Sequence, residues 1–263
     1  MNRAVLVLCL GAAVFSTSVA SAEDDSEPVP LFLEGYAGQV SYRPGEEVAL
    51  HVSTSAARFQ VEVARLGARR EVVLTQKELA GRVSPIPEDA SSHGCRWPAL
   101  AKFSIPETWR SGYYHVALRA EDGGGKFVQR NRRTVESSCY FIVRAARPGS
   151  VSKVLLQLST NTYNAYNNWG GFSLYGYHGR AGVQGHRVSF ERPPSSQFAS
   201  WEQPFIAWAE SNGYALEYAA NMDLERPELL KPYRLVLSVG HDEYWSAPMR
   251  DQLEAFIAQG GNV

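Results

Sequence analysis

The hydrophobic pattern of the chain changes near residue 148, and this change limits the available folds more than any other feature. Before it, segments such as residues 59–63 alternate apolar and polar side chains, as half-buried strands do. After it, residues 153–158 and 235–239 form nearly continuous apolar runs, which are typical of strands covered on both faces. A Pro-Gly pair at 148–149 lies between the two patterns. The sequence therefore predicts two domains that meet at about this position.

The first domain is expected over residues 31–147 as a β-sandwich. A Pro-Gly pair at 44–45 is a turn signal between two extended runs, and three consecutive glycines at 123–125 indicate a loop. Residues 140–143 are apolar and read as a closing strand. Short strands separated by turn signals at this spacing are typical of a β-sandwich.

The second domain is expected over residues 148–263 as an α/β domain. Its predicted elements are strands at 153–158, 214–218 and 235–239 and helices at 202–212 and 246–259. This order of strands and helices is that of a doubly wound parallel sheet. The last residues, 260–263, look like the beginning of another buried strand, so we expect the α/β domain to be incomplete and truncated at its C-terminus.

The first 22 residues are predicted to be a signal peptide. A basic residue at position 3 is followed by an apolar stretch, and Ala20-Ser21-Ala22 fits a small-x-small cleavage site. A membrane anchor is the alternative, but the apolar run is short and is interrupted by glycine and serine residues. Cleavage after Ala22 would leave a linker over 23–30 and a secreted or periplasmic protein. Cys95 and Cys139 would then either form a disulfide or stay as two buried thiols.

Charge and motifs exclude several classes of function. The net charge of −1 gives no reason to expect nucleic acid or an anionic membrane as a partner, and no segment beyond the signal peptide is apolar enough to span a membrane. A small-molecule substrate is the expected partner, and an oligomer is compatible with the sequence. No Gly-x-Ser-x-Gly elbow follows a predicted strand, no Cys follows residue 139 to serve a glutamine amidotransferase, and no Gly-rich phosphate motif follows residues 153–158.

Polar and aromatic residues gather where two predicted strands end. One such segment is 159–175, which is rich in Asn and Tyr, and the other is 240–245, with the sequence Gly-His-Asp-Glu-Tyr-Trp. Ligands of open α/β sheets bind beyond the carboxyl ends of the strands. Phenol and carboxylate oxygens are hard ligands that suit ferric iron, whereas zinc sites favour Cys and His. The ordinary alternatives are that these tyrosines pack with satisfied hydroxyls and that Glu243 caps the following helix.

The same segments carry a resemblance to a known family. The motifs are Thr162-Tyr163-Asn164-Ala165-Tyr166-Asn167, Ser173-Leu174-Tyr175, Arg192-Pro193 and Gly240-His241-Asp242-Glu243-Tyr244. Together they resemble the large (beta) subunit family of N,N-dimethylformamidase, from about residue 31 to the end of the chain. The resemblance implies an amidohydrolase with one iron ion held by two Tyr and one Glu, on a glutamine-amidotransferase-like α/β fold preceded by β-rich domains.

Carried onto this chain, the resemblance implies that Tyr166, Tyr175 and Glu243 hold a mononuclear ferric iron. It also implies that His241 is a nearby polar partner or general base. The segment between the two tyrosine motifs is much shorter than in dimethylformamidase, so the substitutes for Tyr175 are Tyr163, Tyr177 and His178. The family also uses an Asn and a further Glu that would fall beyond residue 263.

Two functions from different classes follow. The first is an iron-dependent amidohydrolase that acts on an amide-type C–N bond of a small substrate. The second is an exported, non-catalytic binding protein, with a β-sandwich module and an α/β pocket for a polar ligand such as a sugar. The positions of Tyr166 and Glu243 distinguish them, because a metal site requires their oxygens to lie a few ångströms apart in one cavity.

Overall fold

The computed structural model describes residues 30–121 and 133–263, and within them the protein is mostly β-sheet with few helices. The predicted signal peptide at 1–22, nearly all of the predicted linker at 23–30 and the three glycines at 123–125 lie outside the described residues. Within the described ranges, no helix is both long and apolar enough to cross a membrane.

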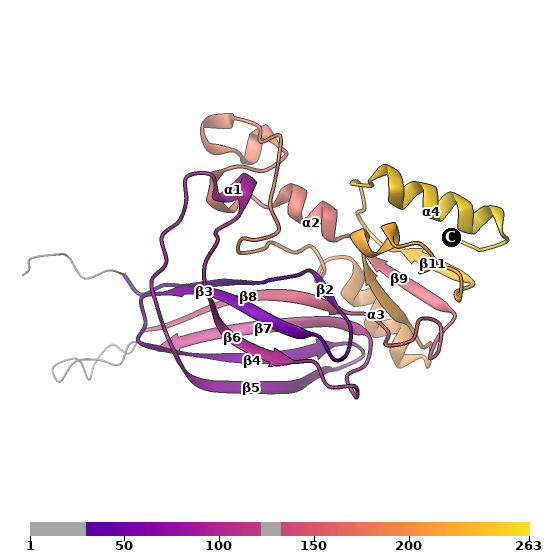
Figure 1. Cartoon of the computed structure of the whole chain (residues 1–263), viewed down its shortest axis with the longest axis horizontal. Helices are drawn as coiled ribbons and strands as arrows, with labels where there is room; N and C mark the ends of the chain where they lie inside the picture. The colour runs from indigo at the N-terminus through magenta and orange to yellow at the C-terminus, as the bar shows by residue number, and fades with distance from the viewer. Residues whose placement is uncertain (1–29, 122–132) are drawn as a thin grey trace, which may run out of the picture.

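Two β-sheets face each other in the first half of the chain (Figure 1). The smaller sheet has the order β1-β3-β6, and both of its strand pairs are antiparallel. The larger sheet has the order β2-β8-β7-β4-β5, and only the short β2 pairs in parallel. The strands are β1 (Leu33–Ala37), β2 (Ser41–Tyr42), β3 (Glu47–Thr54), β4 (Arg58–Leu66), β5 (Arg70–Ala80), β6 (Ala99–Ser104), β7 (Gly112–Glu121) and β8 (Thr134–Val143).

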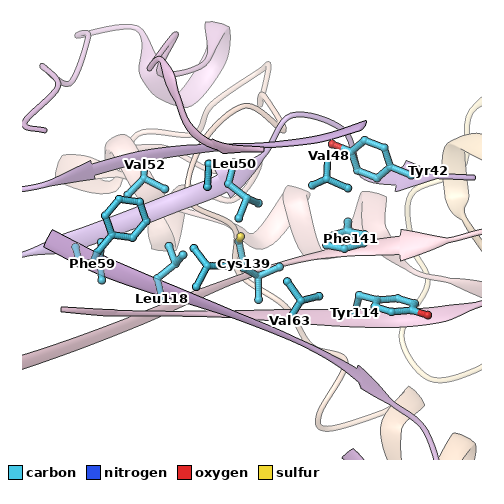
Figure 2. Packing of buried hydrophobic residues seen from close by; sticks show 14 of the residues in the cluster. Tyr42, Val48, Leu50, Val52, Phe59, Val63, Tyr114, Leu118, Cys139 and Phe141 are labelled. Carbon is cyan, nitrogen blue, oxygen red and sulfur yellow. The ribbon is translucent and has the colours of Figure 1, made fainter. Parts of the chain in front are cut away.

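Alternate side chains of these strands fill the space between the sheets, as Figure 2 shows. Val61 and Val63 on β4 are fully buried, while the neighbouring Gln60 and Glu62 are partly exposed. This period of two is the one expected for strands with one buried face. The predicted β-rich region is therefore confirmed. Its core cluster includes Tyr42, Val48, Leu50, Val52, Phe59, Leu118, Cys139 and Phe141.

A long connection between β5 and β6 reaches away from the sandwich toward the second half of the chain (Figure 1). It contains the one-turn helix α1 (Ala90–His93). Trp97 from this connection packs edge-on against Trp169, with 5.6 Å between the ring centroids. We call residues 81–98 the arm, because this segment extends from the sandwich and contacts the loops of the second half.

The second half contains a three-stranded parallel sheet of order β10-β9-β11. Its strands are β9 (Val154–Leu158), β10 (Glu217–Ala220) and β11 (Leu235–Ser238), and its helices are α2 (Thr160–Tyr166), α3 (Glu202–Ser211) and α4 (Ala247–Ala258). Leu156 and Leu158 of β9 pack toward α3, whereas Leu155 packs toward α4. Helices therefore cover both faces of β9, which explains its continuous apolar sequence.

One predicted strand begins later than expected. The sequence predicts a strand at 214–218, but β10 runs from Glu217 to Ala220. The backbone N–H of Tyr214 instead donates to the carbonyl of Ala209, which closes the end of α3. That hydrogen bond holds Tyr214 in the helix-terminal loop, and 59% of its surface is exposed.

The two halves of the chain share one buried interface. Tyr113 of the larger sandwich sheet stacks on Phe198, with 3.7 Å between the centroids, inside a cluster that also contains β9 and α3 residues. Arg65 of β4 makes a two-pronged ion pair with Glu210 of α3, at 2.5 and 3.1 Å. A second buried ion pair joins Arg144 to Asp223 at 3.2 Å. The sandwich and the α/β region are therefore packed together rather than linked loosely.

The two cysteines are separate buried thiols in this arrangement. Cys139 lies in the sandwich core, and Cys95 lies in a different cluster around Tyr36 and Trp97. Burial raises the pKa of each thiol to about 12. Both are therefore protonated at neutral pH.

We predict that Phe198→Ala lowers the free energy of unfolding by about 3–5 kcal/mol, since it removes a buried aromatic ring and leaves a cavity. Urea unfolding followed by circular dichroism measures the change. The matched control is Trp208→Ala, because Trp208 is 56% exposed and should cost at most about 1 kcal/mol. Equal losses in the two variants would contradict the packing role of Phe198.

Candidate functional site

The candidate site forms at the carboxyl ends of β9 and β11, which are adjacent parallel strands. Helix α2 begins two residues after β9, and residues 240–244 follow β11. Parallel pairing brings the segments that leave both strands to the same edge of the sheet. Side chains 68 or more residues apart in sequence therefore meet there.

The structure brings the four predicted site residues together. Tyr175 Oη donates a hydrogen bond to Glu243 Oε2 at 2.6 Å, and Tyr166 also hydrogen-bonds the Glu243 carboxylate. The Tyr166 and Tyr175 rings stack, with 4.2 Å between their centroids. His241 Nε2 lies 3.2 Å from Glu243 Oε1, and its ring centroid is 5.6 Å from that of Tyr166.

The cluster is open to solvent. The side chains of His241 and Glu243 are 36% and 39% exposed, and both tyrosines are partly exposed. A small molecule or an ion can reach the carboxylate without displacing core residues.

The pKa values of the two partners move in opposite directions. Burial, together with the hydrogen bond donated to Glu243, raises the pKa of Tyr175 above its ordinary value. The same hydrogen bond lowers the pKa of Glu243, since it stabilises the carboxylate. At neutral pH the pair is therefore a neutral phenol and a charged carboxylate.

The substitutes for Tyr175 lie elsewhere or make other contacts. Tyr163 is fully buried, and its hydroxyl hydrogen-bonds the buried Glu202. Tyr177 is 70% exposed, and the ring of His178 packs on it at 4.2 Å. Tyr175 alone among these residues hydrogen-bonds Glu243 in the part of the chain that the structure describes.

Backbone contacts fix the segment that carries Glu243. Thr162 Oγ1 on α2 accepts a hydrogen bond from the Glu243 backbone N–H at 2.9 Å. Gly240 has a φ of +88°, and a Cβ there would lie 2.4 Å from the Cβ of Trp201. Only glycine fits this turn without strain. The turn therefore sets the direction in which His241 and Glu243 leave the sheet.

The partly buried carboxylate of Asp242 connects the ends of β9 and β11. It accepts hydrogen bonds from Gln157 at 2.9 Å, Ser238 at 2.8 Å and Asn221 at 3.2 Å. Sequence reasoning assigned no role to Asp242 or to Thr162. The polar Gln157 inside an apolar strand was the available signal, since a buried amide needs a partner.

The donor set at the site consists of two phenols and one carboxylate, with an imidazole beside them. Among the described residues there is no cluster of three or more His, Cys, Asp or Glu side chains that would hold a metal. The set found here differs from such clusters, because two of its three oxygen-bearing groups are tyrosine phenols. Oxygen donors of this kind fit a hard cation rather than zinc.

Comparison with known proteins adds the family. The N,N-dimethylformamidase beta subunit from an Alcaligenes species is 28% identical over 216 residues, covering 64% of this chain and 26% of that protein. The beta subunit from Paracoccus aminophilus is 26% identical with the same coverage. The chain thus spans about a quarter of the length of these relatives.

Among solved structures, one from a study of T cell specificity and activation by the bacterial superantigen toxic shock syndrome toxin-1 is 10% identical. It covers 44% of this chain and 99% of that chain, with a TM-score of 0.25. A score this low carries no argument about fold or function.

The family itself is established by a match over most of the chain. A profile described as N,N-dimethylformamidase beta subunit-like, C-terminal, matches residues 60–263. This range includes the whole α/β region and all four candidate site residues. The chain belongs to the N,N-dimethylformamidase beta subunit-like family.

Proposed function

We propose that this chain carries the metal site of an iron-dependent amidohydrolase that cleaves an amide-type C–N bond in a small molecule. The observation that carries the proposal is the convergence of Tyr166, Tyr175 and Glu243 in one hydrogen-bonded cluster. Family membership supports an amidohydrolase-like protein. The substrate, and the activity of the whole protein, are part of this proposal.

The residues present fit a ferric ion. Tyr166 and Tyr175 would bind as phenolates and Glu243 as a carboxylate, giving a compact, anionic set of oxygen donors. A phenol has an ordinary pKa of about 10, so a highly charged cation is needed to displace its proton at neutral pH. Hard cations of this kind prefer oxygen ligands.

The bound metal would polarise the substrate carbonyl and lower the pKa of a bound water. Proton transfer and positioning of the carboxylate would be performed by residues of this chain. His241 is exposed and lies 3.2 Å from Glu243, so its imidazole can take up or deliver a proton at the edge of the site. Thr162 holds the Glu243 backbone, which keeps the carboxylate directed toward the tyrosines.

The alternative of a non-catalytic binding protein is less well supported. That reading expects Tyr166 or Glu243 to face solvent alone or to pack in the core. Instead the two side chains hydrogen-bond each other in a cluster that solvent reaches. We further propose that the α/β region has a glutamine-amidotransferase-like fold and that the protein is exported through its first 22 residues.

The first prediction concerns metal content. The purified chain should bind one ferric ion per molecule, and Glu243→Ala should lose it, since the variant removes the carboxylate that accepts from Tyr175. Elemental analysis after loading and desalting measures the content. Glu254→Ala, at an exposed carboxylate on α4, is the control and should keep full content. Wild-type protein without iron would contradict the metal site.

The second prediction concerns the phenols. Iron-loaded protein should absorb visible light through phenolate-to-iron charge transfer, and Tyr175→Phe should weaken this band, whereas Tyr177→Phe should not. Iron affinity should fall as pH falls, because protons compete for the phenolates. Tyr175 is neutral before metal binding, so its loss should reduce the slope of log affinity against pH by about one.

That slope is measured by competition with a chelator of known pH dependence. An unchanged slope in Tyr175→Phe would remove this residue from the ligand set. A change in Tyr177→Phe of the same size would indicate that the tyrosine assignment is wrong.

The third prediction concerns His241. If it handles the proton, His241→Asn should lower the turnover number by roughly 100- to 10,000-fold while iron content stays the same. Release of amine from a panel of N-alkylformamides and acetamides measures turnover. His93→Asn, on the arm, is the matched control because its ring is also partly exposed. Full activity of His241→Asn against every substrate that the wild type cleaves would exclude the proton-transfer role.

A further inference from the structure

Among the residues that the structure describes, Arg192 is the largest side chain that is completely buried, and none of its hydrogen-bond partners there is a carboxylate. A buried guanidinium without a counterion is costly, so it requires a full set of acceptors. Burial lowers its pKa to about 10, which still leaves it protonated at neutral pH.

Carbonyl oxygens accept from every part of this guanidinium. Nε donates to Ser189 O at 3.0 Å, and Nη1 donates to Trp169 O at 2.6 Å and to Phe172 O at 3.0 Å. Nη2 donates to Asn167 O at 2.8 Å and, at longer range, to Asn164 O and Oδ1 at 3.4 and 3.5 Å. Arginine has five N–H groups, and the backbone carbonyls of five residues accept from them here.

Four of these five residues lie within 164–172, the segment that contains Tyr166 and leads into Tyr175. We call residues 164–172 the tyrosine loop. The loop has little regular structure after α2, and Gly170 and Gly171 both have positive φ values. The carbonyl groups of Asn167, Trp169 and Phe172 accept from Arg192, and a buried carbonyl left without a donor is costly.

The segment that carries Arg192 is itself held by the arm, which extends from the sandwich. The Cys95 N–H donates to Glu191 O at 2.7 Å, and the Ser189 N–H donates to Ser91 O at 2.9 Å. Cys95 and Ser91 belong to the arm. A continuous set of contacts therefore runs from the sandwich through the arm and Arg192 to the tyrosine loop.

We infer that Arg192 is a positioning residue that holds the tyrosine loop in the conformation that directs Tyr166 and Tyr175 at Glu243. Its effect on loop order follows from the hydrogen bonds alone. Its effect on metal binding rests on the proposed function. Lysine cannot replace it, because one ammonium group presents its three donors at a single point and cannot span these carbonyls.

The test compares Arg192→Lys with Arg144→Lys in the full chain. Arg144 is the matched control, since it is also a buried arginine but pairs with Asp223 away from the tyrosine loop. Hydrogen–deuterium exchange of metal-free protein should be about tenfold faster or more across residues 165–174 in Arg192→Lys, with little change in the sandwich core. Arg144→Lys should leave the exchange of residues 165–174 unchanged.

The iron-loaded proteins give the second measurement. The charge-transfer band should shift or weaken in Arg192→Lys and stay at the wild-type position in Arg144→Lys. Unchanged exchange in the tyrosine loop of Arg192→Lys would overturn the inference, as would loss of protection throughout the chain, which would indicate a general structural role. If the wild type takes up no iron, the proposed function fails, and exchange alone then decides the role of Arg192.

Discussion

The parallel pairing of β9 with β11 is the constraint on which the candidate site depends. It places the start of α2 and the turn at Gly240 at one edge of the sheet, so that Thr162 reaches the backbone of Glu243. The partly buried Asp242 carboxylate then joins Gln157 and Ser238, which lie at or next to the ends of the two strands. Without this pairing the tyrosines and the carboxylate would have no common location.

The sandwich contributes to the site although none of the four candidate residues belongs to it. Two buried ion pairs and the stacked Tyr113 and Phe198 rings fasten it to the α/β region, and the arm extends this contact to the loops above the sheet. A buried ion pair is weak evidence of added stability, because desolvation offsets most of the attraction. Its clearer effect is to fix orientation, since breaking either pair would leave a buried charge without a partner.

Sequence patterns predicted the strands better than the loops, for a physical reason. The apolar runs at residues 153–158 and 235–239 predicted β9 and β11. Burial on both faces explains the run in β9, whereas β11 lies at the sheet edge and is only partly buried. The polar segments at their ends were likewise visible in sequence. The meeting of Tyr166 with Tyr175 was not, apart from the family resemblance, because the loop between them is shaped by carbonyl contacts to Arg192 that leave no periodic trace. The late start of β10 has a similar origin in one hydrogen bond of Tyr214.

The hydrogen bond between Tyr175 and Glu243 links the fold to the proposed chemistry. In the metal-free protein one proton lies between the Tyr175 phenol, whose pKa is raised, and the Glu243 carboxylate, whose pKa is lowered. The hydrogen bond through this proton holds the two oxygens 2.6 Å apart. A cation of higher charge would replace that proton between oxygens that the fold already places together. The conformational entropy of the ligand side chains would then be lost largely during folding rather than during metal binding. Contacts of Arg192 and Thr162 and the turn at Gly240 order the ligands in the folded protein. Under the proposed function, this preorganisation would explain how residues that touch no metal or substrate contribute to the site.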